Sequence, residues 1–101
     1  MKIAVVKEMA PLEKRVAATP ETVRKYIDLG FEVGVEENAG LNSNYTNDNY
    51  EAAGAKIYSD TEKLISSANI IIKVNNIHND GEGADNIKYY NKNNIIIGFL
   101  K

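Results

Sequence analysis

Apolar runs and polar segments follow one another along this chain in a strand–helix order. Residues 3–6 are apolar and rich in β-branched side chains, which is typical of a strand buried on both faces of a parallel sheet. Thr19 and Pro20 predict a helix start, because a threonine hydroxyl can cap free backbone N–H groups and proline fits the first helical position. Gly30 then predicts the end of that helix, and residues 31–35 alternate as the next strand.

The middle of the chain repeats this order. Thr46 is expected to cap a short helix that ends at Gly54, and residues 55–58 form a brief strand. Ser59 and Glu62 have the spacing of a capping box, and the residues that follow place apolar side chains on one helical face. A second strand–helix unit is therefore predicted.

Two continuous apolar runs complete the pattern, at residues 70–74 and 95–99. Runs without alternation are typical of central parallel strands that helices cover on both faces. The polar segment 75–94 between them is predicted to be a mobile loop. Five strands alternating with helices predict one α/β domain over residues 1–101, a three-layer sandwich with a mostly parallel five-stranded sheet in a flavodoxin-like (Rossmann-like) strand order.

Composition and charge narrow the possible functions. The chain has 101 residues, 44% of them hydrophobic, and a net charge of -2 that is spread along its length, so no nucleic-acid surface is expected. It has no cysteine and a single histidine, His78, which excludes thiolate catalysis, disulfides and multi-histidine metal sites. No apolar stretch approaches the ~20 residues that cross a bilayer, and the N-terminus has no export signal, so we expect a cytoplasmic protein without membrane insertion.

Charged residues follow the predicted strands at the end where ligands collect in sheets of this kind. Arg15 lies in the loop after the first strand, where its guanidinium could hold a carboxylate. Lys73 ends an apolar strand and must either reach water or pair with an acid such as Glu8. Two interpretations remain open: an ion pair of Glu8 with Arg15 or Lys73 that orders the loops, or an anion site formed by these residues.

The glycines do not form a dinucleotide fingerprint. Residues 38–41 and 52–55 do not place Gly-x-Gly-x-x-Gly between a strand and a helix, and residues 81–83 follow no strand directly. His78 has no nucleophile near it in sequence and is expected to be a solvated loop residue. From the residues alone, this chain binds no cofactor and no metal and carries no catalytic group.

Recognisable motifs lie at residues 7–8, 13–20, 30–33, 39–41, 50–55, 68–74 and 98–100. Together they resemble the N-terminal signature of the alanine dehydrogenase and nicotinamide nucleotide transhydrogenase family. Ala4 and Val6 stand in place of the family's usual glycine and proline. The resemblance implies an N-terminal α/β domain, incomplete because it lacks the family's NAD-binding Rossmann domain, so that NAD belongs to the full-length parent.

Three features indicate a branch of this family. Asn75 stands where alanine dehydrogenases have a substrate-binding lysine, and Lys101 stands where they have a catalytic histidine. The segment 75–94 is similar in length to that of transhydrogenases. The chain therefore resembles the start of the alpha subunit of a proton-translocating NAD(P) transhydrogenase, an inner-membrane complex whose beta subunit binds NADP(H). Alone, this chain is expected to be inactive.

Two alternatives remain open. The chain could resemble a fragment of an alanine dehydrogenase or saccharopine dehydrogenase, with Arg15 and Lys73 binding the carboxylate of a 2-oxo acid. It could also be a stand-alone assembly module. Because a domain cut before its closing elements exposes apolar surface, self-association is expected in either case.

Overall fold

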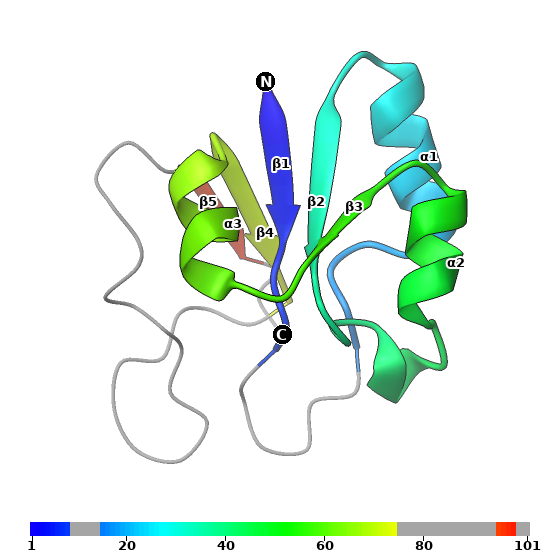
Figure 1. Ribbon diagram of the computed structural model, residues 1–101. Helices are drawn as coiled ribbons and strands as arrows, with labels where there is room; N and C mark the ends of the chain where they lie inside the picture. The colour runs from blue at the N-terminus through cyan, green and yellow to red at the C-terminus, as the bar shows by residue number, and fades with distance from the viewer. Residues whose placement is uncertain (9–14, 75–94, 99–101) are drawn as a thin grey trace, which may run out of the picture.

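A five-stranded sheet forms the centre of the protein, with all strands parallel and in the order β3-β2-β1-β4-β5 (Figure 1). The computed structural model describes residues 1–8, 15–74 and 95–98. The sequence therefore predicted the α/β class and the parallel sheet correctly. The strands are β1 (Lys2–Val5), β2 (Glu32–Glu36), β3 (Lys56–Tyr58), β4 (Ile70–Lys73) and β5 (Ile95–Gly98).

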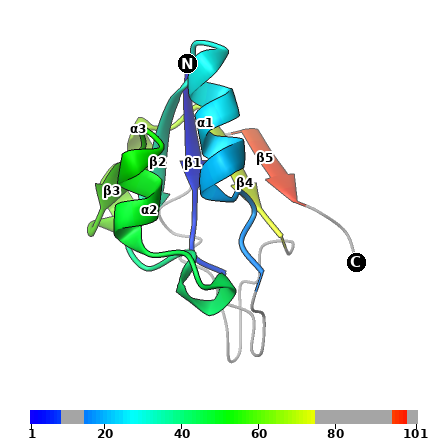
Figure 2. The same ribbon diagram turned by 90° about the vertical axis from the view of Figure 1, so that its right-hand side faces the viewer.

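Helices cover both faces of this sheet and complete the three layers (Figures 1 and 2). Helices α1 (Pro20–Asp28) and α2 (Asn47–Ala52) pack on one face, and α3 (Thr61–Ser67) packs on the other. A short 3-10 helix, η1 (Leu41–Ser43), precedes α2. In the part of the chain that the structure describes, no helix has the length and apolar character needed to cross a bilayer.

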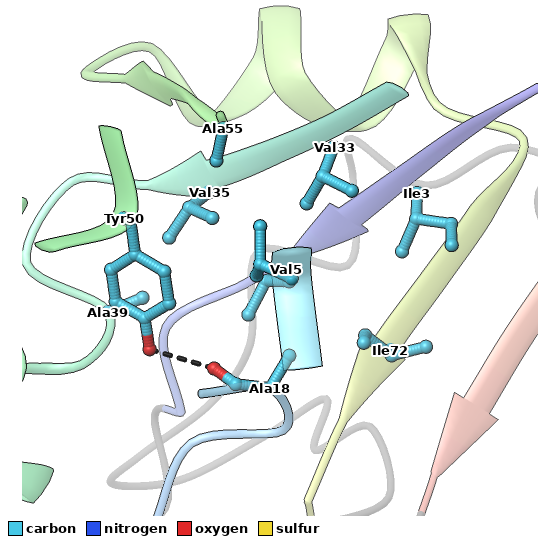
Figure 3. Packing of buried hydrophobic residues seen from close by; sticks show 10 residues of the cluster. Ile3, Val5, Ala18, Val33, Val35, Ala39, Tyr50, Ala55 and Ile72 are labelled. Atoms are coloured by element: carbon cyan, nitrogen blue, oxygen red, sulfur yellow. Dashed lines mark hydrogen bonds between the residues drawn. The ribbon is translucent and has the colours of Figure 1, made fainter. Parts of the chain in front are cut away.

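The buried strands divide their side chains between two apolar layers because successive residues of a strand point to opposite faces. Ile3 and Val5 of β1 face α1 and α2, where Val33 and Val35 of β2 join them (Figure 3). Tyr50 and Ala18 belong to the same layer, and the Tyr50 hydroxyl donates a hydrogen bond of 2.8 Å to the carbonyl oxygen of Ala18. The second layer, under α3, contains Ala4, Val6, Leu64, Ile65, Ala68 and Ile71.

The helix boundaries follow the predicted caps with one exception. The Thr19 hydroxyl accepts a hydrogen bond of 3.2 Å from the Thr22 N–H, and Gly30 has a φ of +99°, as expected for a left-handed helix end. The capping box predicted at Ser59 and Glu62 is wrong. Asp60 caps α3 instead, because its carboxylate accepts the Lys63 N–H at 3.2 Å.

The strand order is Rossmann-like and not flavodoxin-like. In a flavodoxin-like sheet β3 would lie beside β1, whereas here β4 takes that place and β3 lies at the edge. The reason is the placement of the helices. Because α1 and α2 lie on one face, the chain winds outward from β1 to β3, and α3 then carries it across the other face to the free side of β1.

Strand β5 also differs from the expectation. The apolar run at 95–99 predicted a central strand covered by helices, but β5 is the outer strand, and Ile95, Ile96 and Ile97 are 57%, 40% and 44% exposed. The described helices lie over β1, β2 and β3 instead. The predicted mobile loop at 75–94, which includes Asn75 and His78, lies outside the described residues, as does Lys101.

Candidate functional site

The strand order reverses between β1 and β4, and this point fixes the place of the candidate site. From β1 the chain builds the sheet outward to β2 and β3, then returns to add β4 on the other side of β1. In open parallel sheets the crevice beyond the carboxyl ends of two such strands is the usual ligand site. Glu8 follows β1 at this end, and Lys73 is the last residue of β4.

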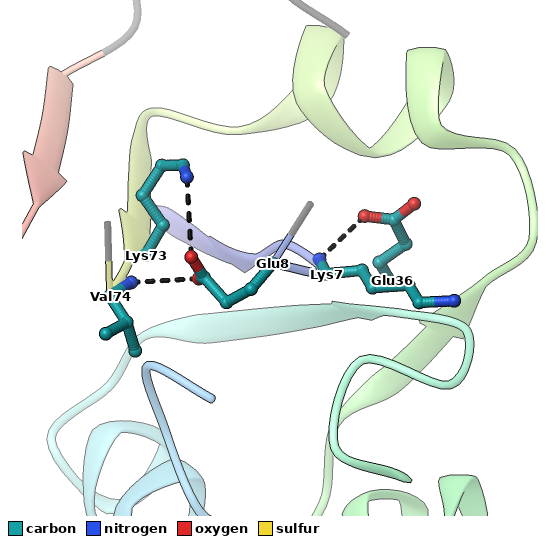
Figure 4. Close-up of polar contacts among 5 residues, drawn as sticks. All are labelled: Lys7, Glu8, Glu36, Lys73 and Val74. Carbon is teal, nitrogen blue, oxygen red and sulfur yellow. Dashed lines mark hydrogen bonds and ion pairs between the residues drawn. The ribbon is translucent and has the colours of Figure 1, made fainter. Parts of the chain in front are cut away.

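Glu8 and Lys73 form an ion pair at this point (Figure 4). The Lys73 Nζ lies 3.4 Å from Glu8 Oε1, and the Val74 N–H donates a hydrogen bond of 2.8 Å to Glu8 Oε2. The two charged side chains are only 1% and 3% exposed, respectively. Of the alternatives that the sequence left open, the structure shows the Glu8–Lys73 ion pair.

Burial makes each charge depend on the other. Removing an ammonium and a carboxylate from water costs several kcal/mol per ion, which their mutual attraction offsets only when further hydrogen bonds satisfy the remaining groups. Glu8 has both kinds of partner, an ammonium on one oxygen and a backbone N–H on the other. Among the described residues, no buried side-chain nitrogen or oxygen lacks a hydrogen-bond partner. The pair therefore holds the ends of β1 and β4 together as a unit.

A second carboxylate, which the sequence analysis missed, acts at the end of β2. Glu36 Oε1 accepts the Lys7 N–H at 2.8 Å (Figure 4), and its Oε2 accepts the Thr61 hydroxyl at 2.7 Å. It thereby links the end of β1 to the first residue of α3. The signal was present in the sequence, because Glu36 ends an apolar strand just as Lys73 does.

Both carboxylates bind backbone N–H groups at the carboxyl ends of the strands. Glu8 accepts from Val74 and Glu36 accepts from Lys7, and both donors lie at the carboxyl ends of the strands. Backbone N–H groups beside an ammonium are the usual partners of an anion. Glu8 therefore binds both the Lys73 ammonium and the Val74 N–H at this end of the sheet.

Arg15, in contrast to the buried pair, is exposed to solvent. It lies in the segment that leads to the Thr19 cap of α1. An exposed guanidinium does not carry the desolvation cost that a buried ammonium such as that of Lys73 carries. The predicted role of Arg15 in anion binding stays a prediction.

The fold and the charged strand ends define a doubly wound α/β domain with a candidate anion site at its switch point. Residues 4–101 match the family model described as "Alanine dehydrogenase/PNT, N-terminal domain". This chain belongs to that family, as its motifs indicated.

Relatives of known name include both branches of the family. Alanine dehydrogenase 1 of Staphylococcus aureus (strain Mu50 / ATCC 700699) is 47% identical over 100 residues, which cover 99% of this chain and 25% of the relative. A solved transhydrogenase from Sinorhizobium meliloti has a TM-score of 0.85 at 33% identity and covers 99% of this chain and 28% of its own. A solved L-alanine dehydrogenase has a TM-score of 0.84 at 25% identity, with 99% and 26% covered. The chain thus spans about a quarter of the length of these relatives.

NAD, the cofactor that the family implies, does not fit the first strand–helix connection of this chain. A dinucleotide pyrophosphate binds at a helix N-terminus that a glycine-rich turn leaves open. Here the connection from residue 6 to residue 19 contains no glycine, and the Thr19 hydroxyl already accepts the Thr22 N–H at the start of α1.

Proposed function

We propose that this chain is the N-terminal part of an oxidoreductase of the alanine dehydrogenase type. In this proposal it supplies a binding face for a substrate carboxylate, and a separate NAD-binding domain of the parent protein supplies the hydride chemistry. The observation that carries the proposal is the 47% identity with Alanine dehydrogenase 1 over 99% of this chain. That identity exceeds the 33% shared with the solved transhydrogenase.

At the switch point, each charged residue would have a different role in binding the substrate. Lys73 would provide the ammonium group that attracts the carboxylate of a 2-oxo acid, and Arg15 would hold the same carboxylate from the exposed side. Glu8 would act as a positioning residue, because its two oxygens fix both the Lys73 Nζ and the end of β4. None of these groups transfers hydride, so the isolated chain is expected to be inactive.

A second candidate is the alpha subunit of an NAD(P) transhydrogenase. Its support is the solved transhydrogenase from Sinorhizobium meliloti, with a TM-score of 0.85, and the identities of Asn75 and Lys101. In this candidate the partners are the rest of the alpha subunit and the beta subunit, in a complex at the inner membrane. The chain would then serve as scaffold for hydride transfer between NAD(H) and NADP(H).

A chimeric enzyme tests the first candidate. The N-terminal quarter of Alanine dehydrogenase 1 is replaced by this chain, and alanine-dependent reduction of NAD⁺ is measured. Because Asn75 and Lys101 replace the lysine and histidine implied by the resemblance, the chimera is expected to be inactive. The double substitution Asn75→Lys and Lys101→His is expected to restore the activity.

Two controls make the outcome decisive. Lys63→Met changes an exposed lysine of α3 and should leave the restored chimera unaffected. The chimera must bind NADH, which shows that the rest of the enzyme is folded. A folded double variant without alanine-dependent activity contradicts the proposal. Hydride transfer from NADH to an NADP⁺ analogue by the same graft in the Sinorhizobium meliloti transhydrogenase would favour the second candidate.

Calorimetric titration examines the binding face by itself. Pyruvate is expected to bind the 101-residue chain weakly, and Arg15→Ala is expected to abolish the signal, whereas NADH should give no saturable heat. Saturable binding of NADH would overturn the assignment of the dinucleotide to another domain. Pyruvate binding that is unchanged by Arg15→Ala would remove Arg15 from the site.

The exposed β5 strand supports a further proposal, that the isolated chain self-associates through this edge. Ile95, Ile96 and Ile97 form an exposed strand without charge, whereas the opposite edge is a three-residue strand that carries Lys56. Charged and very short edge strands resist pairing, and uncharged apolar edges favour it. Two β5 strands related by a twofold axis could pair without charge repulsion.

Light scattering at increasing concentration tests this arrangement. The chain is expected to form dimers, and Ile96→Lys, which adds a charge to the edge, is expected to return it to monomers. Lys63→Met serves as the matched surface control. A wild-type chain that stays monomeric at high concentration contradicts the proposal.

A further inference from the structure

A cavity of about 440 Å³ opens at the amino ends of β2 and β3, at the opposite end of the sheet from the Glu8–Lys73 pair. Cavities of this size accommodate small organic ligands. Its apolar wall consists of Ile27 from the last turn of α1, Phe31 before β2 and Val33 within β2. No residue of the switch-point site lines it, so it is a separate site.

The cavity exists because neighbouring strands begin at different levels. Strand β2 begins at Glu32, whereas β3 begins at Lys56, which pairs with Gly34. The first part of β2 therefore has no β3 residue beside it. The turn before β3 contains Gly54, whose φ of +106° is strained for other residues and whose Cα faces the Ile27 side chain. A side chain there would come within 2.8 Å of Ile27 Cδ1 and alter this wall.

Two lysines give the cavity a positive charge on the face of the sheet that α3 covers, whereas Ile27, Phe31 and Val33 belong to the face of α1 and α2, so the cavity extends around the edge of β2. Lys2 Nζ lies 4.1 Å from the centre of the Tyr58 ring, and Lys56 Nζ lies 5.2 Å from it. Lys2 also donates hydrogen bonds to the Tyr58 hydroxyl and, at 2.7 Å, to the Ser67 hydroxyl. The hydrogen bond from Lys2 lowers the pKa of Tyr58, and the nearby charges of both lysines act in the same direction.

A carboxylate completes the charge pattern. Glu32 is exposed at the same cavity, and neither Glu32 nor Lys56 forms an ion pair with another described residue. The cavity thus combines an apolar wall, two ammonium groups and one carboxylate. A ligand that satisfies all three has an apolar body, a carboxylate for the lysines and an ammonium group for Glu32.

We propose that this cavity binds an apolar α-amino acid, with its side chain against Ile27 and Phe31, its carboxylate at Lys56 and Lys2, and its ammonium group at Glu32. Lys56 is the main partner of the carboxylate, because Lys2 already donates to Tyr58 and Ser67. The site is independent of the proposed dehydrogenase function. It would persist in this chain whichever family branch the parent protein belongs to.

Three related probes test the proposal by NMR titration of the 101-residue chain. Leucine carries all three features, 4-methylpentanoate lacks the ammonium group, and 3-methylbutylamine lacks the carboxylate. Leucine is expected to shift the amide signals of Val33 and Gly54 with a dissociation constant on the order of 1 mM. Loss of the carboxylate is expected to weaken binding about tenfold, and loss of the ammonium group about threefold.

Two substitutions of exposed residues assign the charges. Lys56→Met is expected to weaken leucine binding about tenfold, and Glu32→Gln about threefold while leaving 4-methylpentanoate binding unchanged. Lys63→Met, a lysine outside the cavity, is the matched control and should change nothing. The absence of saturable shifts at Val33 and Gly54 would overturn the proposal. So would leucine binding that Lys56→Met leaves intact, or 4-methylpentanoate binding at least as tight as leucine.

Discussion

Two lysines at opposite ends of the same sheet are held in opposite ways. Lys73, at the carboxyl end of β4, has a side chain that is 1% exposed, and it pairs with Glu8, whose side chain is 3% exposed. Lys2, at the amino end of β1, is partly exposed and donates to two neutral hydroxyl groups, those of Tyr58 and Ser67. The comparison shows that the lysine at the switch point is buried and paired with an opposite charge, whereas the lysine at the amino end is partly exposed and hydrogen-bonded to neutral groups.

The largest effect is expected from breaking the buried pair. Glu8→Ala leaves the Lys73 ammonium without this partner in a buried position, which should reduce the free energy of unfolding by about 3–5 kcal/mol. Urea denaturation measures the change. The double variant Glu8→Ala, Lys73→Met removes both charges and should recover a large part of the loss. A loss below about 1 kcal/mol for Glu8→Ala would mean that the pair is hydrated in solution.

The second largest loss of stability is expected from a side chain at Gly34, which lies close to Leu64, Tyr58 and Lys2. In Gly34→Ala, the new Cβ would lie 2.7 Å from Leu64 Cδ1 and 2.8 Å from Tyr58 Cε1. Both side chains must move, so the free energy of unfolding should fall by about 2–3 kcal/mol. Thermal unfolding gives the value, and a cost near zero would show that Tyr58 moves aside freely.

A pH dependence of about 2 kcal/mol is expected from Tyr50. Burial, with a smaller contribution from Tyr45, raises the pKa of Tyr50 to about 12 from 10.0. The unfolded chain then releases this proton at lower pH than the folded chain, so stability is complete below pH 10 and is lost as the pH rises toward 12.

The Tyr50→Phe variant isolates this contribution to stability. It should lower the free energy of unfolding at neutral pH, because the hydrogen bond to Ala18 is lost. It should also flatten the decline between pH 10 and 12, which urea denaturation at several pH values measures. An unchanged decline would assign the effect to other groups.

The smallest loss of stability is expected from replacing Lys2, in contrast to breaking the buried pair of Lys73. Lys2→Met removes hydrogen bonds from a partly exposed ammonium and should cost only about 1 kcal/mol. Because the hydrogen bond from Lys2 is the main cause that lowers the pKa of Tyr58, the variant should raise that pKa toward its ordinary value. Ultraviolet titration, with Tyr58→Phe to identify the signal, measures this shift. A cost as large as that of Glu8→Ala would remove the contrast between the two ends.

Most of the local structure was predictable from short-range patterns. Thr19, Gly30, Thr46 and Gly54 mark helix ends because capping and left-handed backbone depend on neighbouring residues in the chain. Asp60 was missed because two adjacent residues offer caps, and the sequence does not show which one the tertiary structure uses. The candidates Glu8 and Lys73 followed from charges at the ends of apolar strands.

The sequence therefore specifies the strands, most helix ends and the charged residues, since these depend on periodicity and on contacts within a few residues. Three features depend on packing between distant segments: the position of β4 beside β1, the exposure of Ile95 to Ile97, and the link from Glu36 to Lys7 and Thr61. An apolar strand has the same pattern at the centre of a sheet and at its edge. Only the path of the helices across the two faces decides which strands become neighbours, and hence which charges meet.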